Sequence, residues 1–416
     1  LESAVEDAIG RRNAWRAGLF TRLPELEIWR GLAPPATADD LTRLLDAPGK
    51  ALLQFVVDEH DLLVMLAIAP ADPDSAVALT ANVVTIERQD LAERIGRALD
   101  RTALAGVEAW RKGSAELFGL LPDEIVDGIE GAASIIVVPD DVLWRVPIEA
   151  MPIGPEYLAD HAVVTYASSL STILRAPATH SNDAAASVVV VHSPQLPSAL
   201  LDKLKATTPS WLIRPGEAAG AEALRIEEAA RADKDDVVEA LAVHGGADAT
   251  SARLKEIGDA AALHLAAPFR VNTASPLFSP ILLTPVSQEI DGERPAPREA
   301  EFEIRELFNL ERVAPTVMLS DPAALSKRDA AAALAPVAWA WRAPGATTVI
   351  LRRWGGDEEI ARDVMAAFYE GLRAGRSAAE ALHEARRAVR RTDAGSTPAA
   401  WAGWLILIGK QPEFNQ

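Results

Sequence analysis

The 416-residue sequence predicts an α/β fold in which helices cover both faces of a mostly parallel sheet. Short apolar runs rich in valine and isoleucine, such as "SIIVVPD" (134–140) and "ASVVVVHSP" (186–194), alternate with segments of helical spacing. These runs are apolar throughout, which is typical of strands buried on both faces. The composition is that of a globular protein, with 49% hydrophobic and 24% charged residues.

The first 45 residues are largely polar with helical spacing, and Pro34 and Pro35 interrupt them. Thr37 follows the two prolines and can cap the next helix. Two apolar runs then flank a polar turn at 58–61, which predicts a β-hairpin over 51–70. The remainder of this half predicts one helical segment and then two strands, at 89–121, 134–140 and 161–168.

Strands and helices alternate regularly from residue 186 onward. Short apolar strands are predicted at 186–194, 261–268, 315–322, 345–354 and 404–410. Helices are predicted between them at 221–232, 250–258, 327–341 and 357–375, the third of them broken by Pro336. Ser377 and Glu380 have the spacing of a capping box ahead of one more helix. Residues 287–301 are polar and contain prolines, which predicts a surface loop.

The net charge of −19 creates an acidic field that repels phosphate backbones, so we expect no nucleic-acid partner. The dense basic run "EARRAVRR" (384–391) has helical spacing and is predicted to be a solvated helix face. No apolar run is long enough to cross a membrane, so we expect no membrane partner and a cytoplasmic location. The histidines lack ligand spacing and there is no phosphate-binding glycine loop, so neither a metal nor a small-molecule cofactor is expected.

The ends of two apolar runs are where chemistry is expected, because ligands of open α/β sheets bind beyond the carboxyl ends of the strands. One run contains His264 and ends at Pro268, and the other ends in Ser320, Asp321 and Pro322. In a doubly wound sheet the two runs can be neighbours, which would place a nucleophile beside a base. The sequence has no cysteine, which excludes thiol chemistry at this position.

From residue 51 to residue 409 the order of sequence blocks resembles the CHAT domain family, caspase-like cysteine peptidase modules often found behind tetratricopeptide repeats. The resemblance is carried by "ASIIVVPDDVLWRVPIEAMP", "YLADHAVVTYASSLS", "AALHLAAPF", "TVMLSDPAAL", "APGATTVILRRWGGDEEIARDVMAAFYEGLRAGRSAAEALHEARRAVRR" and "AAWAGWLILIG". It implies a caspase-like three-layer α/β/α sandwich with a mostly parallel sheet and an N-terminal supporting subdomain.

Two departures fall on the residues that carry the family's chemistry. Family members have "HLATHG" where this sequence has "HLAAPF", so His264 matches a structural histidine, Pro268 the catalytic histidine and Phe269 its glycine. They have "LSAC" where this sequence has "LSDP", which puts Pro322 at the position of the nucleophilic cysteine. Proline neither transfers a proton nor attacks a carbonyl, and it has no N–H to donate to an oxyanion. The resemblance therefore implies an inactivated peptidase without catalytic residues.

Other candidate residues have a structural interpretation beside a functional one. His264, among leucines and alanines, is expected to be hydrogen-bonded in the core. The competing hypothesis is an active hydrolase with a rewired site, in which Ser320 is the nucleophile and His192 or His264 the base. Asp357 matches an acid of the family's "WPVDD" segment that can bind a basic side chain, and it also stands where a helix N-cap is expected. His244 is expected in a loop.

Three parts are expected along the chain. Residues 1–45 form a helical lead-in that can be the end of an upstream repeat or adaptor region, 46–180 an N-terminal CHAT subdomain, and 181–416 a degenerate protease subdomain. The predicted function is regulatory binding. The former active-site rim, with Asp357, Asp321 and Phe269 as its binding residues, is expected to hold a protein or peptide partner without cutting it.

Overall fold

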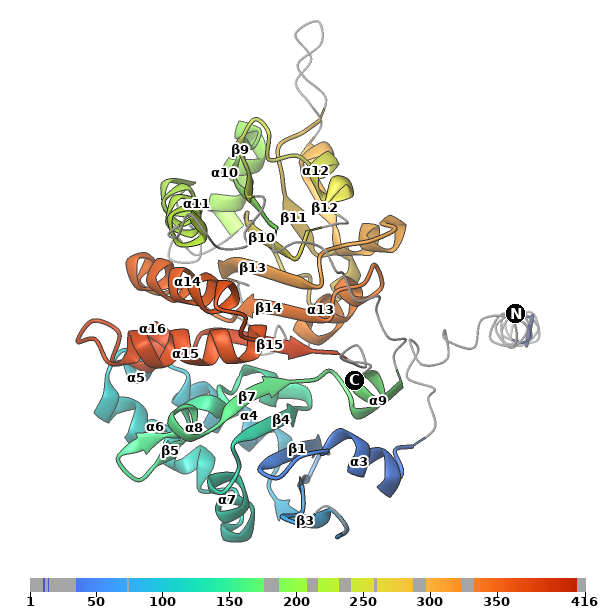
Figure 1. Cartoon of the computed structure of the whole chain (residues 1–416), viewed down its shortest axis with the longest axis vertical. Helices are drawn as coiled ribbons and strands as arrows, with labels where there is room; N and C mark the ends of the chain where they lie inside the picture. The colour runs from blue at the N-terminus through green and yellow to red at the C-terminus, as the bar shows by residue number, and fades with distance from the viewer. Residues whose placement is uncertain are drawn as a thin grey trace, which may run out of the picture.

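The computed structural model describes residues 10, 11, 14, 35–72, 75–175, 187–207, 216–231, 241–257, 260–286, 297–322 and 333–409. One sheet of eleven strands runs through the whole of this part of the chain (Figure 1). Its strands are β1 (Lys50–Val57), β2 (Asp61–Ile68), β3 (Ala78–Thr85), β4 (Ser134–Val138), β7 (Val163–Tyr166), β8 (Val188–Pro194), β9 (Leu241–Gly246), β10 (Ala262–Ala266), β13 (Thr316–Pro322), β14 (Thr348–Arg352) and β15 (Trp404–Ile408). Two short two-stranded sheets add β5 (Pro152–Ile153) with β6 (Glu156–Tyr157), and β11 (Pro280–Leu282) with β12 (Glu301–Glu303).

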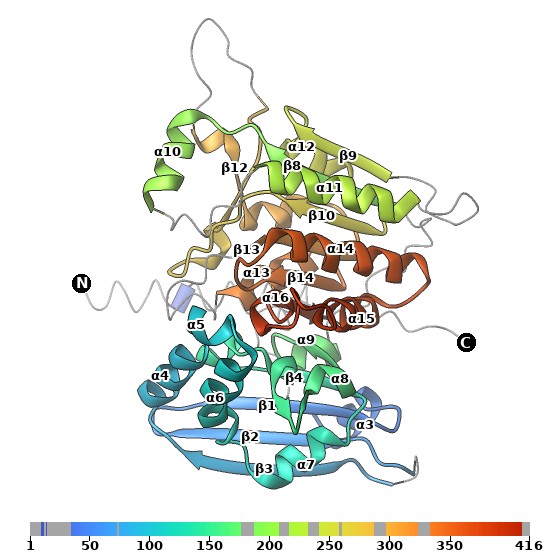
Figure 2. The ribbon, with the colours of Figure 1, turned by 90° about the vertical axis from the view of Figure 1, so that its left-hand side faces the viewer.

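The strand order is β3-β2-β1-β4-β7-β15-β14-β13-β10-β8-β9. Pairing is parallel along the sheet except in the β1–β2–β3 meander and between β14 and β15. Figure 2 shows β1, β2 and β3 side by side at the end of the sheet opposite to β9. The predicted mostly parallel α/β sheet is confirmed, as is the hairpin of β1 and β2.

Helices pack on both faces of the sheet in the half that follows β7. Side chains of β8, β13 and β14 form one core cluster with α11, α14 and α15, while alternate side chains of the same strands pack with α12 and α13. The helices are α3 (Ala38–Leu44), α4 (Arg88–Ala98), α5 (Arg101–Leu104), α6 (Val107–Phe118), α7 (Asp123–Glu130), α8 (Leu158–His161), α9 (Leu170–Arg175), α10 (Ser198–Thr207), α11 (Gly216–Arg231), α12 (Ser251–Glu256), α13 (Leu334–Arg342), α14 (Glu358–Arg373), α15 (Ala378–Arg390) and α16 (Pro398–Trp401). Because both faces of these strands are covered by helices, their sequences are apolar without interruption.

Three helix N-caps predicted from the sequence are confirmed. Thr37 caps α3 in a capping box with Asp40, and Ser377 caps α15 in a box with Glu380. The side chain of Asp357 caps α14. In each case a short polar side chain accepts a hydrogen bond from a backbone N–H of the first helical turn.

The structure differs from the predicted elements in several places. The segment 89–121 is three helices, α4, α5 and α6, because Asp100 accepts a hydrogen bond from the Thr102 N–H (2.9 Å) and starts a new helix. Strands β3 and β9 were not predicted, and His244 lies in β9 instead of a loop. Pro336 does not break α13 but lies in its first turn, where its missing N–H has no intrahelical partner to lose. Residues 323–332 and most of the predicted lead-in over 1–45 and loop over 287–301 fall outside the described residues.

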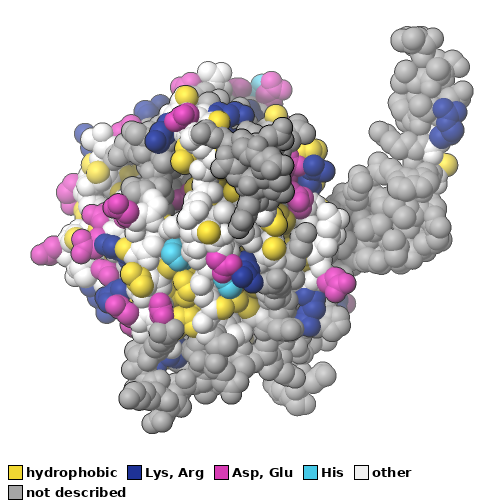
Figure 3. Space-filling model, turned by 90° about the horizontal axis from the view of Figure 1, so that it is seen from above, with side chains coloured by type: hydrophobic (Ala, Val, Ile, Leu, Met, Phe, Trp, Pro, Cys, Tyr) yellow, Lys and Arg dark blue, Asp and Glu magenta, His cyan; other side chains and the backbone are white. Residues whose placement is uncertain are grey.

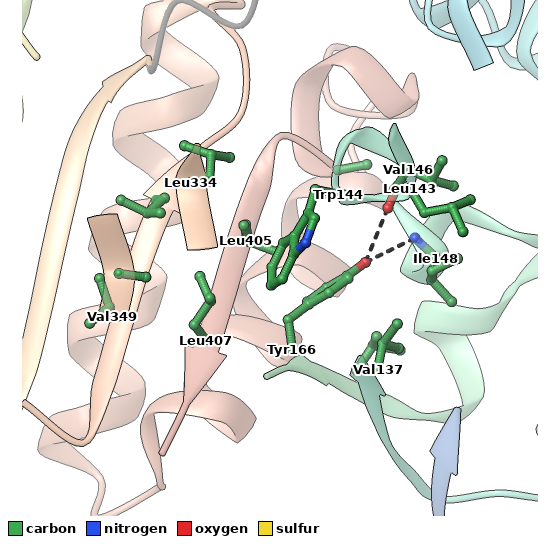
Figure 4. Close-up of a cluster of buried hydrophobic side chains, with 14 of the residues drawn as sticks. Val137, Leu143, Trp144, Val146, Ile148, Tyr166, Leu334, Val349, Leu405 and Leu407 are labelled. Carbon is green, nitrogen blue, oxygen red and sulfur yellow. Dashed lines mark hydrogen bonds between the residues drawn. The ribbon is translucent and has the colours of Figure 1, made fainter. Parts of the chain in front are cut away.

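The two halves of the sheet meet where β7 pairs with β15 through Leu407 and Tyr166. Figure 4 shows the Tyr166 ring beside Trp144, with Leu405 and Leu407 reaching toward it from β15. The Tyr166 hydroxyl accepts a hydrogen bond from the Ile148 N–H (3.0 Å). Because its own proton goes to a carboxylate oxygen of Glu149 (2.5 Å), this tyrosine joins the apolar junction to a buried charge.

Glu149, in the short 3₁₀ helix Ile148–Ala150, forms a buried ion triad with two arginines of the other half. Its Oε1 lies 2.8 Å from Nη1 of Arg353 and 3.4 Å from Nη2 of Arg386. The Arg353 guanidinium also stacks over the Tyr166 ring, 4.8 Å from its centroid. Burial alone would raise the pKa of Glu149, but the charges of Arg353 and Arg386 together with the hydrogen bond from Tyr166 offset this effect, and the pKa is lowered.

Arg386 corrects the interpretation of the basic run 384–391. The run lies largely on α15, but Arg386 is buried and donates to the Trp404 carbonyl, and Arg390 pairs with Asp160 of α8. The prediction of a solvated helix face is therefore wrong for these two residues. Arg386 and Arg390 instead pair with two carboxylates of the first half of the chain, Glu149 and Asp160, which face α15.

We expect Glu149→Gln to lower the free energy of unfolding by about 3–5 kcal/mol, because it leaves two buried guanidinium groups without their counter-charge. The measurement is a urea titration followed by tryptophan fluorescence. The matched control is Glu116→Gln, which removes an exposed pair with Arg97 (3.2 Å) and should change stability by no more than about 0.5 kcal/mol. Equal unfolding midpoints for the two variants would contradict the role of the triad.

The pH dependence of the same variant tests the sign of the Glu149 shift. Since the pKa of this carboxyl is lower in the folded chain, its contribution is complete above the unfolded-state pKa of about 4.3 and is lost as pH falls through the folded-state value. The stability difference between wild type and Glu149→Gln should thus be constant near neutral pH and shrink in acid. A difference that grows on acidification would show the opposite shift.

Candidate functional site

The two predicted site strands are direct neighbours. β10 pairs in parallel with β13, from Ala262 opposite Thr316 to Leu265 opposite Leu319. Beyond this last pair β13 is irregular, since its pairing with β14 passes from Leu319 opposite Leu351 to Pro322 opposite Arg352. The predicted adjacency of the two strands is confirmed: Pro322 is the last residue of β13, and Pro268 follows the end of β10 by two residues at the same edge of the sheet.

The chain beyond Pro268 turns into the core. Phe269 forms an antiparallel bridge with Ile281, and the Leu282 N–H donates to the Pro268 carbonyl (2.8 Å). The Phe269 side chain is only 3% exposed and belongs to the main hydrophobic cluster. Phe269 was expected to be a binding residue, and its burial corrects that expectation because a packed core ring has no surface to offer a ligand.

A buried polar network lies between β10, β13 and the helices α11 and α14. Ser320 donates from Oγ to Oε2 of Glu222 (3.1 Å), and Oε1 of the same carboxylate lies 3.4 Å from Nε2 of His264. On the other side of the imidazole, Nδ1 is 3.1 Å from the Tyr369 hydroxyl. All three of Glu222, His264 and Ser320 are buried. The expected core role of His264 thus has a specific set of partners.

The electrostatics of this network favour one arrangement of protons. Burial raises the pKa of Tyr369, and the nearby Glu222 raises it further, so the phenol stays protonated and can donate to Nδ1 of His264. Nε2 of His264 faces Oε1 of Glu222 at an ion-pair distance of 3.4 Å, whereas Oε2 of Glu222 accepts a hydrogen bond from Ser320.

Glu222 and Tyr369 were not singled out from the sequence. In α11 the buried positions Ala219, Ala223 and Ile226 define the face that meets the sheet, and Glu222 lies on that same face. An acid among the buried positions of an amphipathic helix is the signal that would have predicted it. Tyr369 follows Phe368 in the buried run of α14 and gave no such signal.

The other histidines near this edge have partners of their own. The His192 ring lies against the backbone of Gly245, where a Cβ would come within 2.5 Å of Nε2, and its Nδ1 is 3.1 Å from Ser193 Oγ. Burial lowers the pKa of His192, His264 lowers it further, and Glu222 opposes both. In β9, His244 is paired through Nδ1 with Asp248 (2.6 Å). Ser320 donates its network hydrogen bond to Glu222, and Nδ1 of His192 contacts Ser193. Neither of these two contacts joins Ser320 to His192.

Asp357 and Asp321 differ sharply in exposure. Asp357 is exposed at the start of α14 and accepts from the N–H groups of Glu359 (2.8 Å) and Ile360 (3.3 Å). Asp321 is buried. Of the three predicted binding residues, Asp357 alone presents its side chain to solvent.

Within the described ranges, no group of three or more histidine, aspartate or glutamate side chains is arranged to hold a metal ion. None of the helices described is both long and apolar enough to cross a membrane. Figure 3 shows the end of the molecule nearest β9, where acidic and basic side chains are interspersed.

The fold is similar to that of caspase-like peptidases of known structure. Separase in the Saccharomyces cerevisiae separase–securin complex aligns with a TM-score of 0.51 and 8% identity, over 90% of this chain and 30% of that chain. The chain thus spans less than a third of the length of that relative. The Arg-specific cysteine proteinase gingipain R aligns with a TM-score of 0.39 and 8% identity, over 78% of this chain and 74% of that chain.

No curated protein matches the sequence. The sequence model of the CHAT domain matches residues 93–410, which include both strands of the central junction (β7 and β15), the neighbouring strands β10 and β13, and the helices that hold the buried polar network. With most of its length matched in this way, the chain belongs to the CHAT domain family.

Proposed function

We propose that this chain is a catalytically inactive CHAT domain that acts as a protein- or peptide-binding regulatory module. The observation that carries the proposal is the pair of neighbouring strand ends formed by β10 and β13, where the residues matched to the family's base and nucleophile are Pro268 and Pro322. Proline has no proton to transfer and no nucleophilic atom, and its backbone nitrogen has no hydrogen to donate. The sequence contains no cysteine that can take over the reaction.

The geometry of Ser320 supports the same proposal. Its Oγ is buried and donates to Glu222, so attack on a substrate would require both exposure of the residue and loss of that hydrogen bond. A serine nucleophile needs a base that accepts its proton, positioned by a third group. The alternative function is an active hydrolase in which Ser320 is the nucleophile and a nearby histidine the base.

The binding part of the proposal rests on charge and on position. The net charge of −19 attracts basic partners over long range, and Asp357 offers an exposed carboxylate at the N-cap of α14, in the connection that follows β14, the strand beside β13. The related separase was solved as a complex with another protein, securin. We therefore propose a basic peptide segment of a partner protein as the ligand of this edge of the sheet.

We expect the wild-type protein to remain unlabelled by a serine-reactive fluorophosphonate and to leave Arg- and Lys-ended peptides uncut. The reason is that neither strand end carries an accessible nucleophile with a base. Labelling is read by in-gel fluorescence and peptide cleavage by mass spectrometry. Modification of Ser320, or cleavage that Ser320→Ala abolishes, would establish the rewired hydrolase instead.

The matched gain-of-function variant combines Pro268→His with Pro322→Cys and leaves Phe269 unchanged. Phe269 stays because its removal from the core would cost about 3–5 kcal/mol and confuse the result. The double variant should react with iodoacetamide at least several-fold faster than Pro322→Cys alone, because an adjacent imidazole lowers the pKa of a thiol. Equal rates would mean that the two positions do not face each other as a dyad.

We expect Ser320→Ala to lower the free energy of unfolding by about 1–3 kcal/mol, because Glu222 loses a donor in a buried site. Ser396→Ala removes a hydroxyl bonded to the Asp393 carbonyl (2.9 Å) in an exposed turn and should change stability by less than about 0.5 kcal/mol. Both are compared by urea unfolding. A Ser320→Ala variant as stable as the control would show that the hydroxyl is not part of the structural network.

Two substitutions separate the capping role of Asp357 from its proposed role in binding. Asp357→Asn keeps a cap and removes the charge, whereas Asp357→Ala removes both and should destabilise the protein by about 1 kcal/mol. If the carboxylate binds basic side chains, both variants should weaken the binding of an Arg-ended peptide, measured by fluorescence anisotropy. Unchanged affinity in Asp357→Asn would limit Asp357 to the cap.

A further inference from the structure

The outer edge of β3 is a free strand edge in the part of the chain that the structure describes. There, β3 is the last strand of the central sheet and pairs with β2 on its inner side (Figure 2). It is eight residues long and contains neither a charged residue nor a proline. Charged residues and prolines on edge strands prevent pairing with another chain, so an edge strand without them is open to such pairing.

The hydrogen-bond register shows which backbone groups of β3 point outward. One step beyond the last pair of β2 and β3, the Ile86 N–H donates to the His60 carbonyl (3.0 Å). Because the bonds of an antiparallel ladder alternate, the residues two, four and six positions before Ile86 also direct their backbone groups toward β2. The N–H and C=O groups of Leu79, Ala81 and Val83 therefore point away from the sheet, where they can pair with another strand.

The side chains of the same three residues lie on the exposed face of the strand. Leu79 and Val83 are 63% and 65% exposed, and Ala81 between them is exposed as well. On the reverse face the alternate residues are half-buried, and Asn82 donates to the carboxylate of Glu124 in α7 (2.6 Å). Apolar side chains exposed together at a free strand edge are typical of an interaction site.

The other edge of the described sheet is less suited to pairing. There β9 is six residues long, ends in Gly245 and Gly246, and has half-buried residues throughout. His244 of this strand is paired with Asp248 (2.6 Å), so a charged group stands beside that edge. Of these two edge strands, β3 is the longer and the more exposed.

Two copies of β3 complement each other as an antiparallel pair. A two-fold axis through Ala81, perpendicular to the sheet, places Ala81 opposite its own equivalent and Leu79 opposite Val83 of the second copy. Their outward N–H and C=O groups then face one another as hydrogen-bonded pairs. Residues opposite each other in antiparallel strands share a face, so the exposed apolar side chains of the two copies become neighbours. An isologous contact requires a surface that complements itself in this way.

Charge determines how this contact responds to salt. Each copy has a net charge of −19, and Glu124 lies beside β3 on its reverse face, so two copies repel each other at low ionic strength. The strand itself contributes no charge to the contact. Raising the salt concentration from about 0.1 M to about 1 M shortens the Debye length from about 10 Å to about 3 Å. Salt should therefore strengthen the contact between two copies, whereas it weakens the binding of a basic ligand.

We propose that two copies of this chain associate by antiparallel pairing of their β3 strands, which joins the two central sheets into one. The two copies are related by the two-fold axis at Ala81. The contact lies at the end of the sheet opposite to β9, so it is independent of whether the edge formed by β10 and β13 binds a peptide or cleaves one.

Two variants test the contact in sedimentation equilibrium of the full chain. Val83→Lys places charges on the exposed side of the pair, and Ala81→Pro removes an outward N–H while the hydrogen bonds to β2 remain. Each should raise the dimer Kd at least about tenfold, because each removes a favourable contact of both copies. Ala115→Lys, at an exposed position of α6, is the matched control and should leave the Kd unchanged.

Two results of this experiment would overturn the proposal. One is a wild-type chain that stays monomeric at about 100 μM in about 1 M salt. The other is a dimer that Val83→Lys dissociates and Ala81→Pro leaves intact, since that dimer would be formed by stacked apolar faces and not by paired strands. A wild-type Kd that falls as salt is added would support the contact, and one that rises with salt would contradict it.

A cross-link tests the register directly. Because the sequence has no cysteine, any disulfide of Ala81→Cys joins two chains at this position. The two Cα atoms would lie about 5.5 Å apart at the axis, within the range of a disulfide. Mild oxidation should give at least a fivefold higher yield of covalent dimer for Ala81→Cys than for Ala115→Cys, measured on non-reducing gels. Similar yields would overturn the register, since they would reflect random collisions.

Discussion

The fold depends on a single buried ion triad at the centre of the sheet. Glu149 comes from the first half of the chain, and Arg353 and Arg386 come from the second. Removing three charged groups from water is costly unless they satisfy one another, so the triad is stable only when both halves are docked in one geometry. Tyr166 belongs to both parts of this junction, because its hydroxyl binds Glu149 while its backbone pairs β7 with β15.

This constraint reaches the candidate site through the strands. Arg353 directly follows β14, and β14 pairs with β13, which in turn pairs with β10. Fixing Arg353 against Glu149 therefore fixes the position of the sheet edge at which Pro268 and Pro322 stand. The first half of the chain therefore constrains the second half in two ways, through side-chain packing and through the pairing of strands in one continuous sheet.

Much of this could be predicted from the sequence because the signals are local. The caps at Thr37, Asp357 and Ser377 depend on residues within one helical turn, and the adjacency of β10 and β13 follows from the order of strands in a doubly wound sheet. The role of Arg386 could not be predicted, since its partner Glu149 is far away in the sequence. Strands β3 and β9 are the two edges of the sheet, and their half-exposed side chains lack the continuous apolar pattern of central strands.

The buried network contributes to the fold independently of any reaction at the strand ends. His264, Glu222, Ser320 and Tyr369 are buried inside the sandwich, joined by hydrogen bonds from Ser320 to Glu222 and between His264 and Tyr369, and by the close approach of His264 to Glu222. Their contribution to folding does not require an open active site, because hydrogen bonds between buried groups favour one arrangement of the strands and helices that carry them. Ser320 lies only two residues before Pro322, so the network holds the end of β13 from inside the sandwich, whatever takes place at the edge of the sheet.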